Sequence, residues 1–163
     1  MKKILLLSDT HNYMDNHILK YVRESDEVWH AGDIGTSEVT DQILAIKPLR
    51  AVYGNIDGSE LRVSFPEDLS FSCEGVKVFM THIGGRPGRY ARNVSAKLKT
   101  IKPKLFICGH SHILKIHFDK THSVLFINPG AMGKHGFHKV RTMVRFELEE
   151  GKIKNMEVIE VKR

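Results

Sequence analysis

The sequence predicts a single α/β domain over residues 1–163, with a parallel-rich first half and an antiparallel-rich second half. Short apolar strands alternate with amphipathic helices up to about residue 53, the order typical of parallel β-α-β units. Further on, apolar segments flank tight turns such as Glu74-Gly75, which is typical of antiparallel hairpins. No repeat, low-complexity segment or linker interrupts the chain, which is long enough to bury a substantial core.

The expected elements follow from apolar spacing. In the first half we expect strands over 3–7, 26–29 and 49–53, a helix over 15–23, and a second helix that begins at Thr36 or Ser37 and ends before Pro48. In the second half we expect a hairpin of 69–73 and 76–81, a helix over 89–100 and a strand over 105–108. A further hairpin of 113–118 and 124–127 and two last strands, 140–146 and 153–161, complete the domain.

Composition excludes several classes of protein. With 41% hydrophobic and 27% charged residues, the chain is typical of a folded globular protein. The apolar segment Ile4–Leu7 is too short for a signal peptide or a membrane span, so we interpret it as a strand and expect a cytoplasmic protein with no membrane partner. Cys73 and Cys108 have no CxxC spacing, and we expect both to be small buried apolar residues.

Polar side chains follow five of the predicted strands. Ligand sites in α/β sheets form outside the carboxyl ends of the strands, so these side chains should share one edge. Each motif alone is common, but their recurrence at consecutive strand ends favours a site. Glycines before three of them should let the backbone turn sharply and direct the side chains inward. The predicted donors are Asp9, His11, Asp33, Asn55, His82, His110 and His112.

Seven donors exceed what one ion needs, and a carboxylate that bridges two ions accounts for the number. The set contains imidazoles, carboxylates and one amide oxygen, and no thiolate. These ligands suit Mn²⁺, Fe, Ni or Zn and argue against a structural zinc site rich in cysteine. We therefore expect two divalent transition-metal ions, with Mn²⁺ as the first candidate.

The ordered series Asp-x-His, Gly-Asp, Gly-Asn-x-Asp, His and Gly-His-x-His resembles the calcineurin-like metallophosphoesterases, especially their short single-domain phosphodiesterase branch. The resemblance extends from Asp9 to the turn at residues 128–130, nearly the whole chain. It implies a four-layer α/β/β/α sandwich of the metallophosphoesterase type, with a dinuclear metal centre at the sheet edge.

The resemblance also implies a role for each donor. Asp33 would bridge the ions, and a hydroxide between the ions would attack phosphorus, with Asp33, Asn55 and His82 acting through it. Asp9, His11, Asp33 and His112 would hold the first metal, and Asp33, Asn55, His82 and His110 the second.

One position departs from the family pattern. Many members have a histidine directly after the motif asparagine, where this chain has Ile56. Isoleucine cannot donate a proton, so we hypothesise that the enzyme favours good leaving groups, or uses water or another residue as the acid. Without that histidine, we expect Asp57 to be a turn or helix-capping residue.

Substrate contacts are predicted beside the metal ligands. The net charge of +6 is scattered, and its densest grouping is Arg86, Arg89 and Arg92, which favours a small phosphate-bearing substrate over a long nucleic-acid track. Arg86 is predicted to bind phosphate oxygens, although an exposed surface pair with Arg89 is the alternative. Asn128 and Gly130 are predicted contacts because small residues at this turn would let a phosphate ester approach.

Two features keep alternatives open. His30 would either donate to a ligand carboxylate or pack inside its strand. The loop with Lys134, His135 and His138 would either line the substrate pocket or lie on the surface.

The leading functional prediction is a metal-dependent phosphodiesterase that acts on a small phosphodiester. A phosphomonoesterase with the same centre is the second candidate. A non-catalytic protein-interaction scaffold on the same fold is the third, although a complete ligand set argues against it. Exposed apolar loops in the second half would allow a homodimer.

Overall fold

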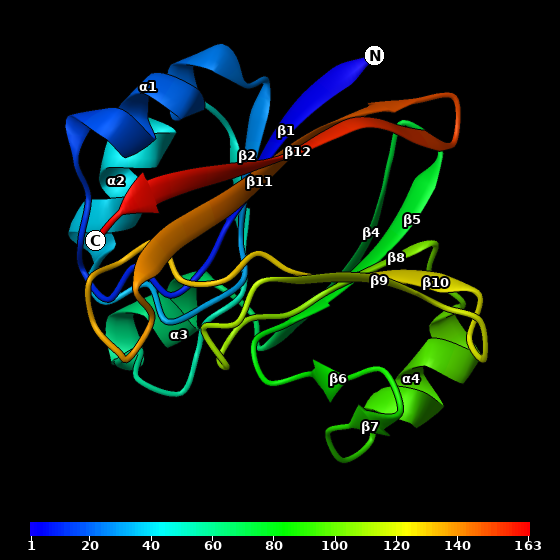
Figure 1. The fold of residues 1–163 in the computed structure, drawn as a ribbon. Helices are drawn as coiled ribbons and strands as arrows, with labels where there is room; N and C mark the ends of the chain where they lie inside the picture. Colours follow the sequence, from blue (N-terminus) through cyan, green and yellow to red (C-terminus); the bar gives the residue numbers. More distant parts are fainter.

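Two sheets pack face to face in the computed structural model, which describes residues 1–163, and helices cover their outer faces (Figure 1). The first sheet has the order β12 (Lys152–Lys162), β11 (Val140–Glu149), β1 (Lys2–Leu7), β2 (Glu27–His30) and β3 (Leu49–Ala51). The second has the order β4 (Asp68–Cys73), β5 (Val76–Thr81), β8 (Leu105–Ile107), β10 (Val124–Asn128) and β9 (Lys115–Asp119). The result is the expected four-layer α/β/β/α sandwich.

Each sheet contains three adjacent parallel strands. β1, β2 and β3 run in parallel in the first sheet, and β5, β8 and β10 do so in the second. Antiparallel strands flank both parallel sets, with β11 and β12 beside β1, β4 beside β5, and β9 beside β10. Each parallel set therefore brings the carboxyl ends of its strands together at one edge of its sheet.

Alternation along the strands builds the layers. In β1, Ile4 and Leu6 lie in the core between the sheets, whereas Leu5 and Leu7 face the helical layer of the first sheet. That layer contains α1 (Asn16–Glu24), α2 (Ser37–Leu44) and α3 (Ser59–Ser64). α4 (Val94–Ile101) covers the second sheet through Val94 and Leu98. The central strands are thus buried on both faces, as parallel strands usually are.

The helix predicted over 89–100 is too long at its start. Arg89–Tyr90 forms β7, which pairs with β6 (Gly85–Arg86) in a small hairpin beside α4 (Figure 1). The helix begins only at Val94, after Asn93 in the left-handed region. Tyr90 has helical spacing to Val94 because both pack into the same core cluster, although only Val94 is helical.

α3 was not predicted. It has six residues and a single buried side chain, Leu61, so its sequence has almost no apolar periodicity to detect. The other predicted elements lie within a few residues of those observed. None of the helices has the length and apolar character that a membrane span requires.

Glu27 ties the parallel strands of the first sheet together. Its buried carboxylate accepts hydrogen bonds from Lys2 Nζ at 2.9 Å, from Trp29 Nε1 at 2.9 Å and from Arg50 Nε. Burial by itself would raise the pKa of Glu27, but these donors outweigh it and hold the pKa below its ordinary value of 4.5. The carboxylate therefore stabilises the folded state in its charged form.

Glu27→Gln should lower the free energy of unfolding at neutral pH by about 2 kcal/mol, because it removes the charge from a network of buried donors. A lowered pKa contributes stability above the unfolded value and loses it as the pH falls through the folded value. The wild type should therefore lose more stability than the variant between about pH 5 and pH 3. Urea unfolding across this range measures both effects.

Glu149→Gln is the matched control, because it removes an exposed carboxylate that pairs with Lys154. It should leave stability nearly unchanged. Equal pH profiles for Glu27→Gln and the wild type would contradict the assignment.

Candidate metal centre

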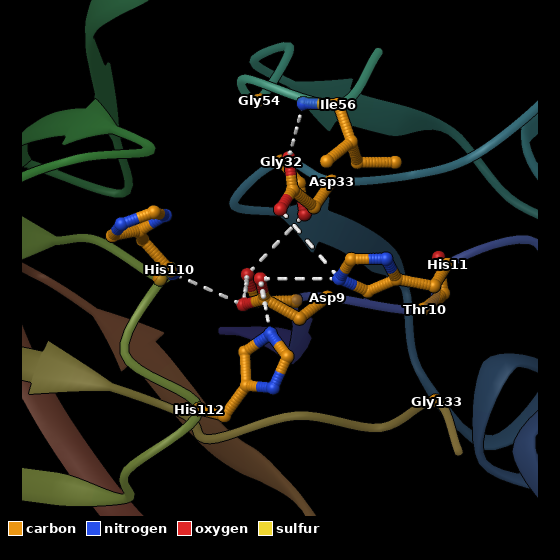
Figure 2. Close-up of polar contacts among 12 residues, drawn as sticks. Asp9, Thr10, His11, Gly32, Asp33, Gly54, Ile56, His110, His112 and Gly133 are labelled. Carbon is orange, nitrogen blue, oxygen red and sulfur yellow. Dashed lines mark hydrogen bonds and ion pairs between the residues drawn. The ribbon is translucent and has the colours of Figure 1, made fainter. Parts of the chain in front are cut away.

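The predicted donors lie together at the edge where both parallel sets of strands end. Figure 2 labels Asp9, His11, Asp33, His110 and His112 among them. Each belongs to the loop that leaves a strand. Asp9 and His11 follow β1, Asp33 follows β2, Asn55 follows β3, His82 follows β5, and His110 and His112 follow β8.

Asp9, His11 and His112 form the first donor group, in which one ligand atom of each residue lies within 4.8 Å of the others. Asp9 Oδ1 is 3.2 Å from His112 Nε2 and 3.9 Å from His11 Nε2. In Figure 2 the Asp9 carboxylate points between the two imidazole rings. One carboxylate and two imidazoles are a common ligand set for a divalent transition metal.

Asp33, His82 and His110 form the second donor group by the same criterion. Asp33 Oδ2 is 3.2 Å from His82 Nε2, and Asn55 Oδ1 is 3.0 Å from His110 Nδ1. The same Asp33 oxygen is also 3.5 Å from His11 Nε2 of the first group. Asp33 therefore faces both groups, the position that a bridging carboxylate needs.

Three buried atoms in this centre have no hydrogen-bond partner, namely Asp9 Oδ1, His11 Nε2 and His82 Nε2. An unpartnered buried polar atom costs free energy, so native structures keep few of them. All three are of the kinds that coordinate Mn²⁺, Fe, Ni or Zn. The residues present therefore fit a site for divalent cations.

The surrounding bonds direct the donors toward this space. His82 Nδ1 lies 2.7 Å from the carbonyl oxygen of Ala31, which leaves Nε2 facing the carboxylates. Asp9 Oδ2 accepts from Ser8 Oγ at 2.6 Å and from the amide of His110 at 3.1 Å, so only Oδ1 remains free. The chain thus presents one selected atom of each side chain to the centre.

Burial and the paired charges shift the pKa values of this centre. Burial lowers the pKa of His11 more than Asp33 and Asp9 raise it. For His82 burial also acts downward, but the close Asp33 carboxylate and the charge of Asp9 raise its pKa above 6.5. The pKa of Asp33 falls despite burial, because His82 and the amide of Ile56 stabilise its charge. A bound cation would displace any proton that His82 carries.

Five of the seven candidate donors have a strained backbone. Asp9, His11, Asp33, His110 and His112 all have φ between 43° and 70°, in the left-handed region that side chains with a Cβ rarely adopt. Such conformations persist only where the surrounding structure enforces them, and they cluster at functional sites.

Asp57 holds the loop that contains Asp33 in its conformation. Its carboxylate accepts from the amides of Ile34 and Gly35 beside Asp33, and from the amide of Gly54. The bond to Gly54 is that of a turn residue, as expected, but α3 is capped by Gly58 and not by Asp57. The bonds across to Ile34 and Gly35 were not predicted, because these residues lie 23 and 22 positions from Asp57 and leave no local pattern.

Asn128 holds in place the loop that contains His110 and His112. Its Nδ2 donates to the carbonyl of Gly109 and to Ser111 Oγ, and its Oδ1 accepts from the amide of Gly130. Asn128 is only 2% exposed. Gly130 faces Thr142, since a Cβ there would lie 2.1 Å from Thr142 Oγ1. Both residues therefore position the loop, and their contact with substrate stays a prediction.

The glycines before Asn55 and His110 act differently from the prediction. Neither Gly54 nor Gly109 has a positive φ, so neither provides the expected sharp turn. They permit close approach instead. A Cβ at Gly54 would lie 2.1 Å from Asp33 Oδ1, and one at Gly109 would lie 2.2 Å from Ser8 Oγ.

His30, the last residue of β2, is packed in the protein interior. The amide of Gly32 donates to its Nδ1 at 3.1 Å, and its Nε2 lies 3.0 Å from Thr10 Oγ1. Burial lowers its pKa to about 4, so the imidazole is neutral. It makes no hydrogen bond to a ligand carboxylate, and the packed alternative is the correct one.

The loop that contains His135 and His138 covers the first donor group. The His135 ring centroid lies 4.7 Å from that of His11, and the His138 centroid lies 5.4 Å from that of His112. His138 Nε2 is 2.8 Å from the carbonyl oxygen of Gly133. The sequence left this loop open between pocket and surface, and the ring contacts place it against the candidate ligands.

Comparison with known proteins agrees with this geometry. A family model of the calcineurin-like phosphoesterase superfamily domain matches residues 1–151. The chain belongs to this superfamily. It is also 30% identical to a probable metallophosphoesterase of Mycoplasma pneumoniae, over 96% of each chain. That relative and the two donor groups together support a metal-binding phosphoesterase.

Solved structures share the fold. Vps29 of Entamoeba histolytica, crystallised with Zn²⁺, has a TM-score of 0.75 at 16% identity and covers 98% of each chain. An archaeal phosphodiesterase has a TM-score of 0.68 at 23% identity, with 98% of this chain and 99% of that one covered. At such identities the likeness establishes the architecture alone.

Gly54→Ala should weaken Mn²⁺ binding at least about tenfold, because the new Cβ would displace the Asp33 carboxylate that faces both donor groups. Isothermal titration of metal-free protein measures the affinity, and thermal unfolding of the same sample reports whether the fold is retained. Gly58→Ala is the control, since nothing lies within 4 Å of its Cβ position. Equal affinities for the two variants would show that Asp33 is not a ligand.

Proposed function

We propose that this protein is a metal-dependent phosphodiesterase that acts on a small phosphodiester with two divalent transition-metal ions, Mn²⁺ being the first candidate. The observation that carries the proposal is that two donor groups converge at one place, and that three of their buried atoms have no hydrogen-bond partner within the chain. If these residues had a purely structural role, the free energy lost by burying those atoms without a partner would not be compensated.

The proposed ligands divide as the geometry groups them. Asp9, His11 and His112 would hold one cation, His82, His110 and Asn55 the other, and Asp33 would contact both. When bound, two cations supply a hydroxide nucleophile near neutral pH and neutralise negative charge on the phosphoryl oxygens.

The chain's own residues hold these groups in place without rearrangement. Asp57 and Asn128 fix the loops from opposite sheets, so the donors do not have to be ordered when substrate arrives. This pre-organisation is the protein's main contribution to such catalysis.

Ile56 limits the leaving group. Its amide donates to Asp33 Oδ1 at 3.1 Å, and its side chain is 47% exposed beside the centre (Figure 2). The backbone of this residue thus serves the site, while its side chain cannot protonate a departing alkoxide. This supports a preference for esters whose leaving group departs without protonation.

The scaffold alternative keeps support from the fold, because Vps29 proteins share it. It does not require the unpartnered atoms of the centre. Metal-stimulated hydrolysis separates the two functions, and the ratio of diester to monoester rates separates a phosphodiesterase from a phosphomonoesterase.

Purified protein with Mn²⁺ should hydrolyse bis(p-nitrophenyl) phosphate faster than p-nitrophenyl phosphate, and a chelator should abolish both reactions. Asp33→Asn should lower kcat/KM at least about 100-fold, since it removes the charge that faces both donor groups. Absorbance of released nitrophenolate measures the rates. Metal-independent rates, or none for any ester, would reject the proposal, and a faster monoester reaction would favour the phosphomonoesterase.

Ile56→His should raise kcat/KM for an alkyl diester such as bis(methyl) phosphate or a dialkyl analogue by about 10-fold or more, because an imidazole there could protonate the leaving oxygen. The rate on an aryl diester should change little, since nitrophenolate needs no proton. Phosphate release coupled to a phosphatase measures the alkyl reaction. Ile56→Gln, of similar polarity but without an acid, is the control, and an equal gain with glutamine would refute the explanation.

A further inference from the structure

A cavity adjoins the candidate metal centre on the side of His110. It encloses about 590 Å³, a volume typical of small-ligand pockets, and His110 and Asn128 lie in its wall. Another part of the wall comes from the β6–β7 hairpin, which carries Arg86 and Arg89. A phosphodiester held by the second donor group would therefore extend one ester arm into this cavity.

The charge of the lining is one-sided. Arg86, Arg89 and Lys115 contribute cationic side chains, and no aspartate or glutamate lines the cavity. None of these three forms a side-chain hydrogen bond or an ion pair within the chain, whereas Arg50, Arg141 and Arg145 each pair with a carboxylate. Unpaired like charges around one cavity repel each other, and an anionic ligand relieves that repulsion.

The rest of the lining is apolar and aromatic. Ile83 and Ile113 are 47% and 67% exposed, unusually open for isoleucine, and the half-buried Tyr90 provides ring surface. Such a lining suits a flat ring, which gains contact area and stacking against aromatic and guanidinium groups. An aliphatic ligand would gain the apolar contact area but would not stack against a ring.

The hairpin is held firmly enough to position its arginines. Tyr90 Oη donates to Asp119 Oδ2 at 2.5 Å, and His122 Nδ1 lies 2.9 Å from the same oxygen. Burial, together with Asp119, raises the pKa of Tyr90, so the hydroxyl stays protonated as the donor. The Tyr90 ring packs edge-on against Phe106 at 5.8 Å. The base of the hairpin is thus fixed to β9 and to the second sheet.

We propose that this cavity binds one arm of the substrate, and that this arm is an aromatic group with a negative charge of its own, beyond that of the scissile phosphodiester. A nucleotide unit has this chemistry, as has a simple aryl anion. The inference rests on the proposed phosphodiesterase function and narrows it to a substrate class. Arg86 and Arg89 are then residues that determine specificity.

Three diesters with p-nitrophenolate as the common leaving group test the proposal, with methyl, 4-carbamoylphenyl and 4-carboxyphenyl as the second arm. With Mn²⁺, the carbamoylphenyl ester should exceed the methyl ester in kcat/KM because of the ring. The carboxyphenyl ester should exceed its neutral isostere about tenfold, mainly through KM. Raising the salt from about 50 to 500 mM should shrink the second difference.

The double variant Arg86→Ala/Arg89→Ala should lower the preference for the charged arm severalfold, because Lys115 is then the one lysine or arginine left in the lining, and should keep a preference for the ring through Tyr90. Arg92→Ala is the matched control, because Arg92 is an exposed arginine of the same segment outside the cavity lining. Equal rates for the charged and neutral arms in the wild type, or an undiminished charge preference in the double variant, would overturn the proposal.

Binding to metal-free protein tests the cavity without catalysis and separates the two sources of the arm. Adenosine 5′-monophosphate should shift the NMR signals of the Gly85 and Ser111 amides, and adenosine or ribose 5-phosphate should bind at least about tenfold more weakly. If benzoate binds as tightly as the nucleotide, the arm is assigned as a simple aryl anion. No shift with either ligand would overturn the proposal, whereas binding without hydrolysis of any diester would reject only the phosphodiesterase function.

Discussion

The structure depends on holding two carboxylates, Asp9 and Asp33, close together in a buried space. Like charges in such surroundings repel, and neither carboxylate has an arginine or lysine as its partner. Imidazoles approach them instead, from backbones in a strained left-handed conformation. Each strained residue costs about 1 kcal/mol or more. The arrangement persists because the two sheets around it are rigid and fully packed.

The sandwich provides that rigidity through strands buried on both faces. β1 contacts the core between the sheets with Ile4 and Leu6, and the helical layer with Leu5 and Leu7. Asp9 follows two residues after β1 ends, so its position is set by a strand that is packed on both faces. His110 follows β8 in a similar way in the second sheet. The centre therefore lies at a junction of the two sheets.

Ligand positions and substrate surface have different structural origins here. The metal-ligand candidates follow the parallel strands of the two sheets, whereas Arg86 and Arg89 belong to a small hairpin outside both sheets. A hairpin can change its residues without disturbing the centre. This separation suits a fold that occurs both in Vps29 and in a phosphodiesterase, because function resides in the site and not in the architecture.

The sequence by itself determined the layers and the identity of the candidate donors. The continuous apolar run Ile4–Leu7 and the apolar spacing of the helix over 15–23 are local signals, and a donor that follows an apolar strand has only one edge of the sheet to occupy. Only the tertiary structure decided how the donors are oriented. The hydrogen bonds of Asp57 to the amides of Ile34 and Gly35, the close approach of Gly54 to Asp33 and the ring contact of His135 with His11 join residues that are distant in sequence. Periodicity and turn chemistry act over a few residues, whereas these contacts exist only once the loops of both sheets have met.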